Sequence, residues 1–398
     1  MLVNLLLILW FLSLCLGQFS ALFVNAFGKF YLFDLVGICF VVFGFFYILI
    51  SKKRSFFVPK VYFPMFGFIF VGFVSLIFGL GKFSTFELAH SSFYLFRFVI
   101  YFLGGILIYN LLNQNILSEK YLVYLAIFSF LLLAVAGFLQ LIFLPDFTVL
   151  DSSLGWDPHK NRLASTFFDP NFLGAYFTLC FNLFLGFRSY SKKLFVPLVS
   201  LCVLCILLTF SRSAWLMLAV SIFVWGLFKY RAILIFSFVL AFCTYFAVPR
   251  IQTRISGITD PSDSASFRLI SWKNTLNIAK DHLILGTGYN TFRFAQKDYG
   301  YFGVDWGGHS GGGSDSSLLL VLATTGILGF LPFITFFANL TRNALKDIKL
   351  SQNLFLVASF SGLLLESFFV NSLFYPQILF FWGISVALFL SNRAYKSH

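Results

Sequence analysis

Long apolar runs alternate with short polar segments along nearly the whole chain. The pattern predicts twelve apolar helices, at residues 2–20, 31–50, 61–80, 93–112, 121–143, 171–187, 194–210, 213–228, 232–248, 316–337, 354–371 and 376–391. Several of these runs are close to the ~20 residues that a helix needs to cross the hydrocarbon core of a bilayer. We therefore expect residues 1–398 to form a single all-α polytopic membrane domain with about twelve transmembrane helices.

Two polar segments interrupt this pattern. The shorter one, residues 144–171, is expected to form a first loop outside the membrane. The longer one, residues 249–315, is expected to form a large loop inserted between the ninth and tenth helices. Residues 266–281 within it have apolar positions at helical spacing, and residues 306–315 are rich in Gly, which is typical of a loop that lets a ligand approach the backbone.

Positive charge predicts the orientation of the chain, because cytoplasmic loops carry an excess of Lys and Arg. With the N-terminus inside, fifteen of the 28 basic residues fall on inside segments. Six fall on short outside segments, and the other seven lie in the 249–315 loop, which is long enough to escape the rule. Both termini are therefore expected in the cytoplasm. The first run lacks the basic flank and small-residue cleavage site of a removable signal peptide, so we expect a retained helix.

Composition agrees with a membrane protein. Hydrophobic residues make up 59% of the chain, charged residues only 11%, and the mean hydropathy is +0.89. The net charge of +13 is better explained by loops that set topology than by nucleic-acid binding, so no nucleic-acid partner is expected. All six Cys lie in apolar runs, which favours packing roles over a disulfide framework or a metal site.

A few charged residues lie close to, or within, the apolar runs. Arg212, in the segment TFSRSAWL, fits two interpretations equally well: an arginine that reaches the head groups from a tight outer hairpin, or an anion clamp at the membrane surface. Arg97 is open to the same two interpretations and favours the structural one. Glu366 must face the protein interior or a water-filled cavity, and a structural ion pair is the favoured role.

The long loop offers further charged residues. It contains no H-E-x-x-H or P-loop sequence. Its two histidines, His282 and His309, have no neighbouring pattern that distinguishes them from solvated loop residues. Spacing alone therefore leaves the function open.

Five motifs, taken in order, resemble the O-antigen ligase and O-antigen polymerase superfamily of bacterial polytopic membrane glycan transferases. They are GFLQLIFLPDFTVL (137–150), GWDPHKNRLASTFFDPNFLGAY (155–176), TFSRSAWL (209–216), FRLISWKNTLNIAKDHLILGTGYNTF (267–292) and DSSLLLVLATTGILG (315–329). Each motif is weak alone, and their order is specific.

The resemblance implies a GT-C-like fold in the bacterial cytoplasmic (inner) membrane with an extracytoplasmic active site. Similar proteins transfer glycans from an undecaprenyl-diphosphate carrier to an acceptor hydroxyl, without a cofactor or metal. Two arginines would hold the diphosphate, here Arg212 and Arg268, with Arg162 as a third candidate. Membrane lipids and an acceptor glycan or lipid would be the other partners.

The base that activates the acceptor is where this sequence departs from the ligase branch. That branch typically has His at the start of the tenth helix, and this chain has Asp315 there. Asp315 can serve as general base, with His309 as a rival. Trp272 and Glu366 are supporting candidates. The Asp favours a polymerase of O-antigen type.

Other functions remain open. Within the same enzyme class, the chain could be a ligase that joins glycan to lipid A core, or a protein O-oligosaccharyltransferase. In another class it could be a flippase or transporter of lipid-linked sugars. Transporters place charge near the bilayer midplane, whereas most polar candidates here lie at one face.

Overall fold

The computed structural model describes residues 2–25, 28–50, 55–150, 158–190, 192–257, 264–301 and 313–391. Each of the twelve predicted ranges overlaps a helix in these residues, as an all-α membrane fold requires. These helices are α1 (Leu2–Leu16), α2 (Leu32–Ile50), α3 (Phe63–Phe78), α4 (Thr85–Asn113), α5 (Glu119–Phe143), α6 (Pro170–Gly186), α7 (Phe195–Leu208), α8 (Arg212–Phe228), α9 (Arg231–Ala247), α13 (Ser317–Lys346), α14 (Ser351–Glu366) and α15 (Pro376–Ser391).

Six of the helical segments in the described ranges are long and apolar enough to cross a membrane, namely Leu2–Ser20, Leu32–Ile50, Lys60–Phe78, Thr85–Asn113, Glu119–Phe143 and Ser317–Lys346. A seventh is added if α9 and the short α10 (Pro249–Ser256), which meet at a bend of 97°, count as one span. The chain is therefore a multi-pass membrane protein by length and composition. That twelve helices cross the membrane stays a prediction.

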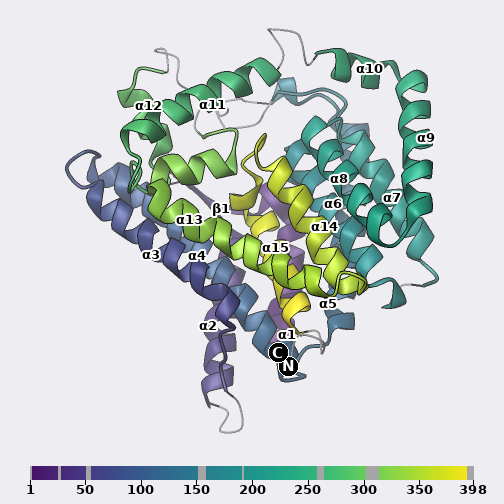
Figure 1. Cartoon of the computed structure of the whole chain (residues 1–398), viewed down its shortest axis with the longest axis horizontal. Helices are drawn as coiled ribbons and strands as arrows, with labels where there is room; N and C mark the ends of the chain where they lie inside the picture. Colours follow the sequence, from purple (N-terminus) through teal and green to yellow (C-terminus); the bar gives the residue numbers. More distant parts are fainter. Residues whose placement is uncertain are drawn as a thin grey trace.

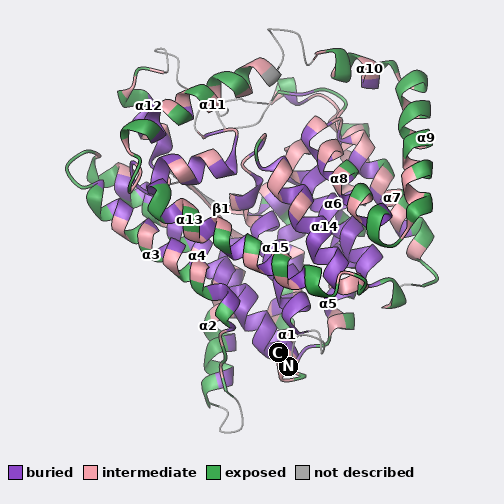
Figure 2. Cartoon of the chain, viewed as in Figure 1, coloured by how far each residue is buried: buried purple, intermediate pink, exposed green. Residues whose placement is uncertain are grey.

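The helix bundle is built around α15, whose residues from Gln377 to Ser391 are all buried. It packs closely against α4, where Gly105 and Gly383 face each other and a Cβ on Gly105 would lie 3.1 Å from the Gly383 Cα. Small residues at a helix crossing let two membrane helices approach in this way. By contrast, α9 has no buried residue and lies at the edge of the bundle, where Figure 2 shows it mostly exposed.

Three helices lie within the range predicted as the large loop. These are α10, α11 (Ser264–Asp281) and α12 (Phe292–Asp298). They gather at one end of the molecule, whereas α1 begins and α15 ends at the opposite end (Figure 1). The polar segment therefore forms a helical cap over one end of the bundle.

A short β-hairpin that the hydrophobic pattern did not predict follows the first helix. Its strands β1 (Ala21–Asn25) and β2 (Gly28–Tyr31) pair antiparallel. The backbone N–H of Tyr31 then donates to Asp34 Oδ2 at 3.0 Å, which ties the hairpin to the first turn of α2.

The helix α13 is broken at Gly326, where φ is 62° and ψ is −167°. The loop after α11 repairs the break with backbone hydrogen bonds, as the N–H groups of Thr287 and Gly288 donate to the carbonyls of Ala323 and Thr324 at 2.9 and 3.0 Å. The N–H of Ile327 donates in return to the loop at 2.8 Å. A polar backbone group freed within a membrane protein needs such a partner. A Cβ on Gly326 would clash with the loop backbone, which explains the glycine.

Candidate active site

Three of the predicted site residues gather at the capped end of the bundle. Arg268 lies in α11, Arg212 is the first residue of α8, and Asp315 precedes α13. Burial lowers the pKa of the Arg268 guanidinium, the nearby Asp315 carboxylate raises it, and the positive charge of Arg212 lowers it again. Charges act on one another in this way only when they are close. The fold therefore brings together residues that are 47 to 103 positions apart in the sequence.

Arg212 is held at the positive end of a helix dipole. Ser211 caps α8 by accepting a hydrogen bond from the Ala214 N–H at 3.3 Å, and its hydroxyl donates to Asn171 Oδ1 at 2.7 Å. The Arg212 guanidinium donates to the backbone carbonyl of Arg254 at 3.2 Å. A helix N-terminus and a guanidinium at the same place favour an anion.

Asp315 is positioned by α11, the helix that also carries Arg268. The Asp315 N–H donates to the Ser271 hydroxyl at 3.1 Å, and the Thr275 hydroxyl donates to Ser314 Oγ at 3.1 Å. Ser316 caps α13 by accepting from the Leu319 N–H at 3.3 Å. Because α11 carries Arg268 and also binds the Asp315 backbone through Ser271, this one helix determines the distance between the two charged residues.

The two supporting candidates, Glu366 and Trp272, lie near Arg268. Glu366 ends α14, is fully buried, and accepts a hydrogen bond from the Ser372 hydroxyl at 2.9 Å. Its charge also acts on Arg268. The Trp272 ring lies 5.4 Å from that of Phe369, and its indole N–H has no hydrogen-bond partner in the described part of the chain. Glu366 therefore faces the site, as its position within an apolar run required.

Arg162 fixes the first outside loop to the turn before α8. It donates to the Thr209 carbonyl at 2.8 Å and reaches Asn171 Oδ1 at 3.4 Å. Nearby, burial and the positive charges of Arg162, Arg250 and Arg254 together lower the pKa of His159 to about 4. These arginines form a second cationic group, which adjoins the first because Arg254 accepts the hydrogen bond from Arg212.

Residues 197–334 match the family model described as O-Antigen ligase. The resemblance to the O-antigen ligase and polymerase superfamily is confirmed over this segment. The segment includes Arg212, Arg268 and Asp315 and leaves out Arg162 and Glu366. No curated protein matches the chain. The O-antigen ligase model supports an enzyme of the ligase or polymerase type that acts on lipid-linked glycans at a membrane.

One acidic residue near the O-antigen ligase motifs was not among the predicted site residues. Asp169 caps α6 by accepting hydrogen bonds from the N–H groups of Asn171 at 2.7 Å and Phe172 at 3.4 Å. Its charge acts on both Arg268 and Glu366. In the sequence an Asp before Pro-Asn reads as an ordinary helix start, so only the fold reveals its second role.

Two further predictions have different outcomes. His309, the rival base, and residues 306–312 of the Gly-rich run lie outside the described residues. Arg97, for which the structural interpretation was favoured, forms an ion pair with Asp34 at 2.7 Å inside the bundle. It takes no part in the arginine groups of the site.

Proposed function

We propose that this chain is a polysaccharide polymerase of O-antigen type. It transfers glycan from an undecaprenyl-diphosphate carrier to the hydroxyl of an acceptor sugar on the outer face of the bacterial cytoplasmic membrane. The observation that carries the proposal is the meeting of Arg212, Arg268 and Asp315, because transfer from a diphosphate needs cations for the leaving group and a base for the acceptor.

The reaction is a substitution at the anomeric carbon of the carrier-linked sugar. The acceptor oxygen forms the new glycosidic bond as the bond between that carbon and the diphosphate oxygen breaks. Asp315, or His309 in its place, accepts the hydroxyl proton. Arg212 and Arg268 hold the departing diphosphate, and they need no metal ion to balance its charge.

The second cationic group suits the same donor. Arg162 and Arg254 lie beside Arg212 and extend the positive surface toward the first outside loop. A diphosphate carries more than one negative charge, so several guanidinium groups lower its energy more than a single pair does. The Asp169 carboxylate keeps this surface from becoming excessively positive when no substrate is bound.

The test is transfer in vitro with purified protein, undecaprenyl-diphosphate-linked repeat units and EDTA, with products resolved on a gel. A ladder of longer carrier-linked chains that persists in EDTA is expected. Arg212→Ala and Arg268→Ala should each slow growth of the ladder by about 10²–10³-fold, and Arg188→Ala, in the turn after α6, is the matched control. No ladder from the wild-type protein would contradict the polymerase.

The ligase alternatives separate in the same assay and in cells. Capture of glycan by added lipid or protein acceptors, without chain growth, would indicate a ligase or an oligosaccharyltransferase. A cell without a polymerase displays a single repeat unit on its acceptor, whereas a cell without a ligase displays none and accumulates carrier-linked polymer. If no glycan is transferred to any added acceptor, the result would favour a flippase.

A further inference from the structure

The turn that leads into α8 has an unusual backbone conformation. Phe210, in the middle of this turn, has a φ of 47° although it is not a glycine. A residue with a Cβ adopts this left-handed region only at a cost in free energy, so tertiary contacts must hold it there. Ser211 then caps α8, and Arg212 begins the helix. The position of the Arg212 side chain therefore depends on how firmly the turn is held.

Two arginines hold the first half of this turn. The Nε of Arg162 donates to the Thr209 carbonyl at 2.8 Å. The Arg250 guanidinium lies over the Phe210 ring, 4.2 Å from the ring centroid. A cation above the face of an aromatic ring is attracted to it, so Phe210 is also held from α10. Neither contact reaches Ser211, which caps α8.

A single side-chain oxygen, Asn171 Oδ1, holds the second half of the turn. It accepts a hydrogen bond from the Ser211 hydroxyl at 2.7 Å and a longer one from Arg162 Nη2 at 3.4 Å. Asn171 is itself fixed, because its backbone N–H donates to Asp169 Oδ1 at 2.7 Å in the cap of α6. Asn171 therefore ties the start of α6 to the residue that precedes Arg212.

The first turn of α6 also lies near the other arginine of the site. Burial lowers the pKa of the Arg268 guanidinium, and the Asp169 carboxylate at the start of α6 is among the charges that raise it. Charges act on one another in this way only when they are close. One helical turn thus borders all three arginines that are proposed to hold the diphosphate.

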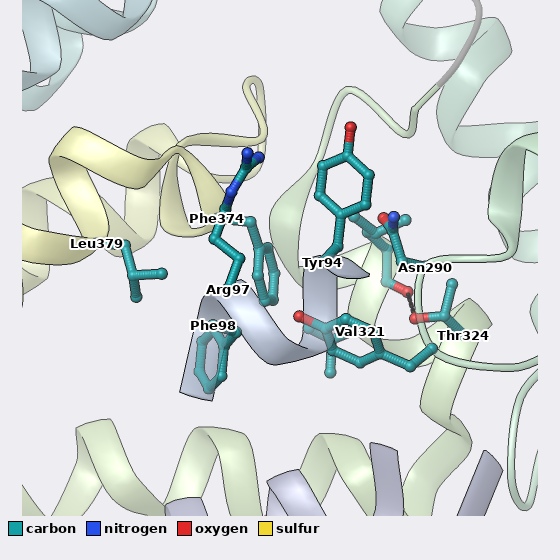
Figure 3. A pocket seen from close by; sticks show the side chains of 10 residues that line it. Tyr94, Arg97, Phe98, Asn290, Val321, Thr324, Phe374 and Leu379 are labelled. Carbon is teal, nitrogen blue, oxygen red and sulfur yellow. Dashed lines mark hydrogen bonds between the residues drawn. The ribbon is translucent and has the colours of Figure 1, made fainter. Parts of the chain in front are cut away.

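Arg97 shows a different way to fix an arginine. It extends from α4 beside Phe374 in the wall of a pocket with a volume of about 30 Å³ (Figure 3), which is room for a water molecule or two. There the Asp34 carboxylate accepts directly from the guanidinium at 2.7 Å. A carboxylate in such contact competes with a phosphate for the arginine. A neutral amide that fixes the backbone before an arginine, as Asn171 does, brings no competing negative charge.

We propose that Asn171 is a positioning residue for the diphosphate of the donor. It holds the turn before α8 and the Arg162 guanidinium in one arrangement, so that Arg162 and Arg212 meet the diphosphate together. The inference rests on the proposed function, since it assigns a further residue to the donor site. Loss of the amide should weaken diphosphate binding without unfolding the chain, because the Ser211 cap and the bond from Arg162 to Thr209 both remain.

The test measures binding of the leaving group without transfer. Radiolabelled undecaprenyl diphosphate is titrated into the purified full-length chain in detergent, which gives a dissociation constant and a number of sites per chain. Asn171→Ala should raise the dissociation constant about tenfold and leave the number of sites unchanged. A purely structural role would instead lower the number of sites, because unfolded chains do not bind. Asn343→Ala, near the end of α13, is the matched control and should change neither quantity.

A double-mutant cycle tests whether Asn171 acts through the arginine that follows the turn. In an Arg212→Ala background the guanidinium that the turn positions is gone, so Asn171→Ala should raise the dissociation constant by less than about threefold. The full tenfold effect in that background would overturn the positioning role. Wild-type binding by Asn171→Ala, or a loss of sites at an unchanged dissociation constant, would also overturn it.

The outcomes separate this inference from the proposed function. A wild-type chain that binds undecaprenyl diphosphate with these variant effects but transfers no glycan would contradict the polymerase and leave the role of Asn171 in diphosphate binding intact. A chain that forms the ladder, and whose Asn171→Ala variant binds like the wild type, would overturn the positioning role alone. A wild-type chain that binds no undecaprenyl diphosphate would overturn both.

Discussion

Two arginines, the buried Arg97 and the half-buried Arg268, lie in opposite surroundings. Arg97 has its own carboxylate, Asp34, at 2.7 Å, and lies over the rings of Phe93 and Tyr94 at 4.7 and 5.3 Å from their centroids. Arg268 shares its surroundings with a second arginine, Arg212, and is influenced by carboxylates from three different segments.

This difference distinguishes a structural charge from one that is ready to bind a substrate. A buried ion pair with a single partner is electrically complete and offers little to a further anion. Two neighbouring arginines repel each other, and an arriving diphosphate removes that repulsion. Burial alone therefore does not identify a functional arginine, whereas its charged neighbours do.

The largest effect, a loss of transfer rate, is expected when the Asp315 carboxylate is removed. Asp315→Asn keeps the shape of the side chain and removes the proton acceptor, so the transfer rate should fall by about 10²–10⁴-fold. The gel assay of chain growth measures it, with Asp347→Asn at the far end of α13 as control. A wild-type rate would transfer the role of base to His309, and His309→Gln would then show the loss.

Breaking the buried ion pair between Asp34 and Arg97 should lower the stability of the fold. Asp34→Asn leaves Arg97 charged in the bundle without its counter-ion, and the free energy of unfolding should fall by about 3–5 kcal/mol. Unfolding by SDS from mixed micelles, followed by tryptophan fluorescence, measures the change. Asp298→Asn in the exposed end of α12 is the control. Replacing both partners, with Asp34→Leu and Arg97→Met, should restore most of the stability; a double variant as weak as the single one would contradict this.

Removing the Arg268 guanidinium should lower the transfer activity and not the stability of the fold. Arg268→Ala removes one preorganised donor to the leaving group, and the transfer rate should fall by about 10²–10³-fold while the unfolding midpoint changes little. Arg268→Lys should recover only part of the rate, because an ammonium cannot form two parallel hydrogen bonds to a phosphate. Full activity in the lysine variant would show that charge alone suffices.

The smallest effect concerns His159, whose neighbours are arginines. Its pKa in the folded chain is about 4 because burial, and then Arg162, disfavour the charged ring. The unfolded chain takes up a proton near the ordinary pKa of 6.5 and the folded chain does not, so stability falls as the pH decreases from 6.5 toward 4. Between pH 6.5 and 5 the loss should be about 2 kcal/mol. His159→Gln should flatten this dependence, and equal slopes for variant and wild type would contradict the assignment.

The sequence predicted the helices well because each one is a long apolar run bounded by polar residues. It also predicted that Arg212, Arg268 and Asp315 act together, though only through the resemblance to a family. The start of α4 was placed eight residues too late, since its first turns are polar and are stabilised by a capping box between Ser84 and Glu87.

Other features carry no local signal. The pairing of Asp34 with Arg97 joins residues 63 positions apart, and the break at Gly326 forms only because the loop after α11 supplies hydrogen bonds to it. In the sequence, Asp169 is an ordinary helix cap and His159 an ordinary loop residue. The arginines that lie near them in the fold come from other segments of the chain. Such arrangements depend on tertiary contacts that one sequence does not display.

The break in α13 has a mechanical consequence. The part of the helix before the break accepts hydrogen bonds from the loop after α11, and the part after the break donates to the same loop from the N–H groups of Ile327 and Leu328. Membrane helices tilt to match the thickness of the surrounding bilayer. Because the loop holds both sides of the break, we expect α13 and this loop to tilt together, which would keep the geometry around Asp315 insensitive to lipid chain length.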